Sequence, residues 1–368
     1  MIALKVVLTG GPCAGKSTGI SKVSKHLREL GYTVYIVEES ATKLINQGIK
    51  PFGNNKIDML TFQEMVLNQQ MAMEKIYELV AKSKDEKCVI ICDRGIMDNA
   101  SFIGKDDFDD LLKRYHLSVN KVLSSYDMVI HLVTTADGAI ENYTLLNNQA
   151  RSENAEEARE QDMRLRKCWS GHNNMKIVGN YGDFDDKMDR VISYIDNYLA
   201  IPKMKRVQRK FLVEKNDELL NYLEGNAQKI VIKNIYFKSD VEKRVKITNI
   251  DGDLCYYYTE QIKGANGVSS IIKEKVINEK DFYRLISKEG VYDSIQKIRY
   301  VIICDKQKYQ VDVYDDMVIL EADVTLQDID IKVPDEFDIL KEVTGEDDYL
   351  NVNLARKREM VMVKKKKL

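Results

Sequence analysis

The residues best suited to chemistry lie near the start of the chain, where the run Gly10-Gly11-Pro12-Cys13-Ala14-Gly15-Lys16-Ser17 matches the pattern G-x4-G-K-[ST]. An apolar strand, Leu4–Leu8, is predicted before this run, and a helix is predicted to begin near Lys16. Glycines let backbone N–H groups wrap around phosphates, and the helix N-terminus adds positive potential. We therefore expect this loop, together with Thr18, to bind a nucleoside triphosphate. Lys16 should reach the β- and γ-phosphates, and the Ser17 hydroxyl should bind Mg²⁺.

Acidic residues at the ends of two other predicted strands complete this chemistry. Asp93 follows the apolar run Val89–Cys92, which is the place of a carboxylate that holds Mg²⁺ directly or through water. Arg94, next in the chain, is placed to reach a phosphoryl group or an acceptor. Glu38 and Glu39 end an earlier strand, where either carboxylate would serve as a catalytic base or would only cap a helix.

A third candidate segment, residues 142–172, is rich in charge and lies between the fourth and fifth predicted strands. Its arginines suit a lid that stabilises transition-state charge, and Arg151 and Arg159 are the candidates. The alternative is a solvated helix face. Trp169 and His172 are interpreted as packing residues of this segment.

One further motif is treated as a chance match. Residues 55–58 read N-K-x-D, a guanine-reading motif, but this run precedes Asp93 and adjoins a predicted helix. We expect Asp58 to lie near the start of that helix, and the choice between GTP and ATP stays open on this motif.

The elements that must position these residues alternate between strand and helix over residues 1–200. Continuous apolar runs indicate a parallel sheet covered on both faces; they are Leu4–Leu8, Thr33–Val37, Val89–Cys92, Met128–Val133 and Lys176–Val178. Helices are predicted over Asp58–Ala81 and Asp185–Leu199, and Pro202 follows the second of these.

After Pro202 the hydrophobic period changes to two, which is typical of antiparallel strands. Eight such runs with few helices favour a closed barrel over a sandwich. The sequence thus predicts an α/β P-loop domain with a parallel sheet (1–200), then an α+β antiparallel β-barrel domain (201–355) and a basic tail (356–368).

Composition limits the remaining possibilities. The chain has 368 residues with 56 Lys+Arg, 58 Asp+Glu and a net charge of −2, which argues against a general nucleic-acid coat. The charge is segregated, however, because residues 356–368 carry seven basic side chains and only Glu359. No apolar run approaches the roughly 18 residues of a membrane helix, and the scattered cysteines fit a reducing compartment. We expect a cytoplasmic protein.

The P-loop, the D-R-G run at Asp93 and the pattern N-x-Q-A-R-x-E…A-R-x-x-D…W-x-x-H resemble one P-loop family. That family groups the ribosylnicotinamide-kinase half of the NadR enzymes with the TRPL-translocation-defect proteins. The second domain resembles a CYTH, or triphosphate-tunnel, domain at Arg206–Val213, Tyr309–Val313 and residues 320–323. Tunnel enzymes open with E-x-E-x-K, whereas here Arg206 and Gln208 replace the glutamates and only Lys210 is retained.

This resemblance assigns candidate ligands to the second domain. Glu321 and Asp323 keep the later acid pair of the tunnel enzymes and would hold metal, while four other cations are predicted to point inward: Arg244, Lys246, Lys297 and Arg299. Exchanging two carboxylates for Arg and Gln weakens a site for a hard cation and adds positive potential. Binding of a phosphorylated ligand is therefore favoured over hydrolysis. A barrel with internally satisfied ion pairs and no ligand is the alternative.

The order of the two domains resembles the TRPL-translocation-defect family, which implies GTP binding, phosphoinositide or phosphatidic acid binding, and a role in membrane trafficking. The basic tail fits attraction to anionic lipid and peripheral membrane association, although a solvated tail, a nuclear-import signal or an RNA contact would explain it as well. We expect a slow NTPase or switch. The alternatives are a small-molecule kinase of the ribosylnicotinamide type and a metal-dependent tri- or polyphosphatase in the barrel.

Overall fold

The computed structural model describes residues 2–140, 154–199, 207–239, 242–263, 270–304, 307–324 and 333–357. The chain divides into two compact units, Met1–Lys203 and Met204–Leu368. Within the described ranges no helix is both long and apolar enough to cross a bilayer.

The first unit is built on a five-stranded parallel sheet with the order β2-β3-β1-β4-β5. Its strands are β1 (Ile2–Gly10), β2 (Thr33–Val37), β3 (Cys88–Asp93), β4 (Met128–Leu132) and β5 (Met175–Val178). The longer helices are α1 (Lys16–Glu29), α3 (Met59–Ser83), α5 (Lys105–Arg114), α7 (Ala155–Cys168) and α8 (Phe184–Tyr198). Shorter ones are α2 (Ser40–Asn46), η1 (Ile96–Asn99), α4 (Ala100–Ile103) and α6 (Val119–Ser124). The predicted parallel α/β fold is confirmed.

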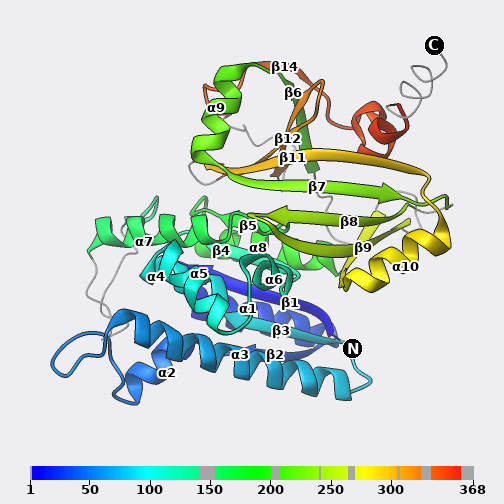
Figure 1. The fold of residues 1–368 in the computed structure, drawn as a ribbon. Coiled ribbons are helices and arrows are strands. Elements are labelled where there is room, and N and C mark those ends of the chain that lie inside the picture. Colours follow the sequence, from blue (N-terminus) through cyan, green and yellow to red (C-terminus); the bar gives the residue numbers. More distant parts are fainter. Residues whose placement is uncertain are drawn as a thin grey trace, which may run out of the picture. The chain divides into compact units, whose positions relative to one another are not determined.

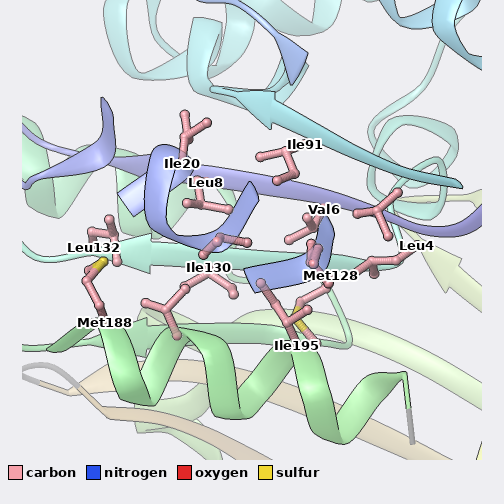
Figure 2. Packing of buried hydrophobic residues seen from close by; sticks show 14 of the residues in the cluster. Leu4, Val6, Leu8, Ile20, Ile91, Met128, Ile130, Leu132, Met188 and Ile195 are labelled. Carbon is pink, nitrogen blue, oxygen red and sulfur yellow. The ribbon is translucent and has the colours of Figure 1, made fainter. Parts of the chain in front are cut away.

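Alternation along β1 divides its side chains between two helical layers. Leu4, Val6 and Leu8 are fully buried in a core cluster that includes residues of α1 and α8. Figure 2 shows Met188 and Ile195 of α8 lying against the strand residues of this cluster. Lys5, on the opposite face of the strand, forms an ion pair with Glu74 of α3 at 2.6 Å. The two faces of the sheet are thus covered by different helices, as Figure 1 shows.

The second unit contains a nine-stranded antiparallel sheet with the order β10-β9-β8-β7-β11-β12-β13-β6-β14. The strands are β6 (Val207–Val213), β7 (Gln228–Tyr236), β8 (Lys243–Ile250), β9 (Asp253–Lys263), β10 (Ser270–Ile277), β11 (Asp293–Cys304), β12 (Gln307–Val313), β13 (Val318–Val324) and β14 (Ile339–Glu342). The antiparallel fold is confirmed. The ninth strand, β14, was not predicted, because its four residues are all exposed and show no apolar alternation.

Two helices cover the apolar face of this sheet. Leu219 and Leu223 of α9 (Asp217–Asn226) are buried against the strands β6, β11, β12 and β13. Phe282 of α10 (Glu279–Glu289) is buried against residues of β7, β8 and β9 (Figure 1). A short turn, η3 (Asp347–Tyr349), precedes a helical segment at 351–357. The other face of the sheet carries the candidate ligand residues described below.

Candidate functional site

The predicted phosphate-binding loop lies between β1 and α1 in the first unit. Gly15 is the N-cap of α1 with a left-handed φ of 86°, and Gly19 N–H donates to its carbonyl at 2.9 Å. The first N–H groups of α1 therefore have no partner within the helix, which makes this end of the helix suited to an anion. Ser17 and Thr18 are exposed on this first turn.

Close packing explains why glycine is needed in the loop. A Cβ on Gly10 would lie 2.2 Å from the carbonyl oxygen of Leu132, and one on Gly15 would lie 2.5 Å from the ring of Phe184. Both positions also have positive φ. The loop backbone is thus pressed against β4 and α8.

Lys16 and Asp93 share one charged region at this edge of the sheet. The Lys16 side chain is buried, and Arg94 N–H donates to the carbonyl of Leu8, which holds the end of β3 beside β1. Burial raises the pKa of Asp93 above its usual value, although Lys16 opposes the shift. Asp93 Oδ1 is buried and has no hydrogen-bond partner among the described residues. A partnerless carboxylate oxygen beside the phosphate loop fits a Mg²⁺ ligand.

Glu38 and Glu39 have different surroundings in the structure. Glu39 forms an ion pair with Arg94 and accepts a hydrogen bond from the Thr42 hydroxyl at 2.8 Å. Burial raises the pKa of Glu39, but Arg94 and Lys16 outweigh this effect and lower it to about 2. Glu38 is exposed and pairs with Lys43 at 2.8 Å. Of the two candidate bases, Glu39 therefore lies in the electrostatic field of Lys16, and it is ionised at neutral pH.

Arg94 has a left-handed φ of 69°, which is uncommon for a non-glycine residue. Its Nη1 is buried without a hydrogen-bond partner among the described residues. The guanidinium therefore keeps a donor beyond its ion pair with Glu39.

Of the two predicted lid arginines, the structure describes only Arg159. Arg151 lies outside the described residues. Arg159, on α7, donates from Nε to the carbonyl of Ala136 at 2.7 Å. In this structure Arg159 therefore fastens α7 to the loop after β4.

Asp162 of α7 is a residue whose role the sequence did not indicate. Its carboxylate is fully buried and accepts from the backbone N–H of Gly11 at 2.9 Å and of Thr134 at 3.1 Å. It also pairs with Arg166 at 3.0 Å and lies 3.0 Å from His131 Nε2. Burial raises the pKa of Asp162, but His131 and Arg166 outweigh it and lower it to about 2. Asp162 is the aspartate of the A-R-x-x-D pattern, but only the fold brings α7 to the phosphate loop, so the sequence did not indicate its contact with Gly11.

Asp98 forms a second buried junction next to Asp93. Its Oδ1 accepts from the Thr9 hydroxyl and from Trp169 Nε1, both at 2.7 Å, and its Oδ2 accepts from Gly95 N–H at 2.9 Å. Trp169 is fully buried, which agrees with its interpretation as a packing residue. Asp58 is the N-cap of α3 and accepts from Thr61 N–H at 2.8 Å, as expected.

The second unit gathers charges on one face of its sheet. Strand pairing aligns Lys210 with Glu321, Arg299 with Asp312, and Arg244 with Thr259, and period-two alternation puts all of these on the face opposite α9 and α10. Lys246, Lys297, Asp312 and Glu321 are all less than one-tenth exposed. The four predicted inward cations and Lys210 therefore share this polar face.

The acids of the polar face are already engaged with cations. Glu321 pairs with Lys210 at 2.7 Å and with Arg299 at 3.1 Å. Asp312 accepts from Arg299 Nε at 2.6 Å and also pairs with Lys297. Burial, with Arg299 adding to it, lowers the pKa of Lys297 to about 8. Two cations thus share one buried carboxylate.

A second group of charges lies on β8 and β10. Lys246 donates to both carboxylate oxygens of Glu274 at 2.8 Å and lies 4.2 Å from the centre of the Tyr257 ring. Arg244 donates to Glu242 at 2.8 Å, but its Nε is buried without a hydrogen-bond partner among the described residues. The Arg244 Nε is therefore a buried donor of the polar face that no described residue uses.

The predicted tunnel metal ligands are only partly described. Asp323 is paired in register with Gln208 on β6, and Gln208 donates to Glu321 at 3.4 Å. Arg206, and the tail beyond residue 357, lie outside the described residues. Among the residues that the structure describes, no group of three or more His, Cys, Asp or Glu side chains is arranged to hold a metal.

The first unit matches a known protein family in sequence. Residues 5–187 match a protein-family model described as an AAA domain. The first unit is similar to AAA domains. This match supports nucleotide binding by the loop described above. A search of curated proteins found no significant match.

Solved structures match part of the chain at low similarity. The inorganic triphosphatase NE1496 is 21% identical with a TM-score of 0.30, over 42% of this chain and 95% of its own. The PH1819 protein from Pyrococcus horikoshii OT3 is 19% identical with a TM-score of 0.26, over 35% of this chain and 80% of its own. The resemblance to the TRPL-translocation-defect family stays a prediction.

Proposed function

We propose that the first unit binds a purine nucleoside triphosphate with Mg²⁺, with GTP favoured over ATP, and hydrolyses it slowly. The observation that carries this proposal is the Asp93 carboxylate, whose buried Oδ1 has no hydrogen-bond partner in the described part of the chain, next to Lys16 and the N-terminus of α1. A cation site, a phosphate site and a fixed positive charge are the parts that phosphoryl transfer requires.

The phosphate loop, Asp93 and Arg159 have separate roles in this proposal. The backbone of residues 10–18 would surround the phosphates, and Lys16 would contact the β- and γ-phosphates. Ser17 and Asp93 would hold Mg²⁺, which neutralises charge on the phosphate oxygens. Arg159 would add positive charge only after leaving the carbonyl of Ala136, so its contribution requires a movement of α7.

Calorimetric titration of the full chain with GTP and with ATP, with and without Mg²⁺, tests the first proposal. Lys16→Ala should weaken binding at least tenfold, while Lys25→Ala, at an exposed position on the same helix, should not. Asp93→Asn should remove the Mg²⁺ dependence. Equal nucleotide affinity of wild type and Lys16→Ala would refute the role of the loop.

A second candidate is a small-molecule kinase of the ribosylnicotinamide type, and the Glu39–Arg94 ion pair favours it. Arg94 fixes an ionised carboxylate in the electrostatic field of Lys16, where it could accept the proton of an acceptor hydroxyl. Turnover of ATP and GTP with and without nicotinamide riboside separates the candidates. Rapid phosphorylation of the riboside that is lost in Glu39→Gln would establish the kinase and displace the slow hydrolase.

For the second unit we propose binding of a phosphorylated ligand, such as a phosphoinositide or phosphatidic acid headgroup, on its polar face. The buried Lys297 and the partly buried Arg299 and Arg244 support this proposal. Sedimentation with vesicles that contain these lipids, with and without residues 358–368, separates the polar face from the basic tail. The alternative, a metal-dependent tri- or polyphosphatase using Glu321 and Asp323, requires metal-dependent release of phosphate from inorganic triphosphate.

A further inference from the structure

Lys187 of α8 is a buried lysine that none of the roles above uses. Its side chain is almost fully buried, and its Nζ donates three hydrogen bonds. The acceptors are the carbonyl of Ala14 at 3.1 Å, the carbonyl of Val133 at 2.8 Å, and Asn180 Oδ1 at 2.7 Å. One ammonium group therefore joins the phosphate loop to the segments that follow β4 and β5.

The bond to Ala14 fixes the direction of a peptide that matters for phosphate binding. The carbonyl of Ala14 and the N–H of Gly15 belong to the same planar trans peptide, so they point in opposite directions. Because Lys187 holds the carbonyl, the Gly15 N–H is directed away from α8. Gly15 has φ of 86°, so other peptide orientations are accessible to it without a side-chain penalty.

Two other side chains bind further backbone groups of the same loop. Asp162 accepts from Gly11 N–H at 2.9 Å, and the Thr134 hydroxyl donates to the carbonyl of Pro12. Lys187 acts at the last peptide before α1, where the N–H groups begin to converge on an anion. It therefore controls the part of the loop nearest to Lys16.

Asn180 connects this anchor to the loop after β4. Its Nδ2 donates to the carbonyls of Thr134 and Asp137, both at 2.7 Å. Arg159 of α7 is bonded to Ala136 within the same loop. A displacement of Lys187 would therefore disturb both the phosphate loop and the segment that holds Arg159.

We infer that Lys187 is a positioning residue for the triphosphate site: it orients the Ala14–Gly15 peptide so that the Gly15 N–H binds phosphate. This inference rests on the proposed nucleotide binding by the first unit. Lys187 does not touch the nucleotide, so its loss acts on the geometry of the loop.

The test compares Lys187→Met with wild type, with Lys16→Ala and with the control Lys25→Met, whose side chain is exposed on α1. Affinity for GTP, ATP and inorganic tripolyphosphate is measured on the full chain by calorimetry. Fluorescence of Trp169, the only tryptophan, reports whether the first unit is folded. The amide signal of Gly15 in ¹⁵N-labelled protein shows whether its N–H senses added tripolyphosphate.

Lys187→Met should weaken binding of all three ligands about tenfold or more in protein whose Trp169 signal is native, because a buried anchor of the loop is lost. The Gly15 amide should shift with tripolyphosphate in wild type and not in the variant. If Lys187→Met does not fold, Lys187→Gln, which keeps an N–H donor on a shorter uncharged side chain, should still weaken binding at least threefold.

Wild-type affinity in a folded Lys187 variant, with binding lost in Lys16→Ala, would overturn the positioning role and leave the proposed function intact. The positioning role of Lys187 would also be overturned if wild-type protein binds tripolyphosphate without a change in the Gly15 amide signal. Absence of nucleotide binding by the wild type would instead refute the proposed function itself.

Discussion

The buried carboxylate of Asp162 accepts a hydrogen bond from the backbone N–H of Gly11 at 2.9 Å, across 151 positions of the chain. The same carboxylate lies against His131 and Arg166. The helix α7, which carries part of the predicted lid, is therefore bonded directly to the phosphate loop. Asp162 therefore connects the charged side chains of α7 to the backbone of the phosphate loop.

Asp162→Ala should destabilise the first unit by about 3 to 5 kcal/mol, because it leaves the buried Arg166 guanidinium without its carboxylate and Gly11 N–H without an acceptor. Asp162→Asn should cost less, since its amide oxygen can still accept from Gly11. Urea unfolding followed by Trp169 fluorescence measures both. Equal midpoints for the two variants would contradict a stabilising role of the hydrogen bond from Gly11 N–H, because Asn keeps an acceptor that Ala lacks.

Gly10→Ala should destabilise the first unit by about 2 kcal/mol or more, since its Cβ would meet the Leu132 carbonyl at 2.2 Å. Gly31 has φ of 83° but nothing within 4 Å of an added Cβ, so Gly31→Ala isolates the cost of the backbone conformation. We expect only about 1 kcal/mol at Gly31. Similar thermal midpoints for the two variants would contradict the close approach of β1 and β4.

Arg94→Gln should raise the pKa of Glu39 from about 2, because the effect of burial is then opposed only by Lys16 and the Thr42 hydroxyl. In wild type the lowered pKa contributes stability above about pH 4.5, and this stability is lost as pH falls toward 2. Carboxyl ¹³C titration of Glu39 checks the shift. Arg94→Lys, which keeps the charge, is the control, and an unchanged titration in Arg94→Gln would contradict the ion pair.

Glu321→Gln distinguishes a binding face from a metal-dependent phosphatase. The substitution frees Lys210 and Arg299 from their shared carboxylate, so affinity for inorganic triphosphate should rise severalfold. A phosphatase that uses Glu321 as a metal ligand should instead lose activity. Calorimetry and phosphate release, each with and without Mg²⁺, measure the two outcomes, and Glu260→Gln on the opposite face of the sheet is the control.

Lys297 should titrate near pH 8, because burial and the neighbouring Arg299 disfavour its charged form. Since its pKa is lowered from 10.5, the second unit should gain stability from this group as pH rises from about 8 to 10.5. Lys297→Met should abolish this gain. Urea unfolding of both proteins by circular dichroism across this pH range gives the comparison, and parallel pH dependences would contradict the prediction.

Local patterns were sufficient to predict most strands of both units. The run Val89–Cys92 is continuous and apolar because β3 lies inside a covered parallel sheet, and β3 indeed spans Cys88–Asp93. The period of two after Pro202 likewise predicted the antiparallel strands. The first half of β11, which begins at Asp293, has no apolar alternation in its sequence, because charged residues such as Asp293 and Lys297 occupy its buried positions.

The candidate site was predictable only where its residues are consecutive in the chain. The phosphate loop has its own spacing signature, whereas Asp162 and Lys187 act on it from helices far along the chain. Nothing in the local sequence distinguishes Lys187 from a solvated lysine. The choice between Glu38 and Glu39 was equally beyond sequence, since it depends on which carboxylate faces Arg94.

The dependence of the phosphate loop on Asp162 and Lys187 has a consequence for biosynthesis. The loop is translated before α7 and α8, which carry its anchors. A nascent chain that ends before residue 187 would carry the complete nucleotide motif without the side chains that hold its shape. We therefore expect the nascent chain to bind nucleotide only after α8 has been synthesised and has packed against the phosphate loop.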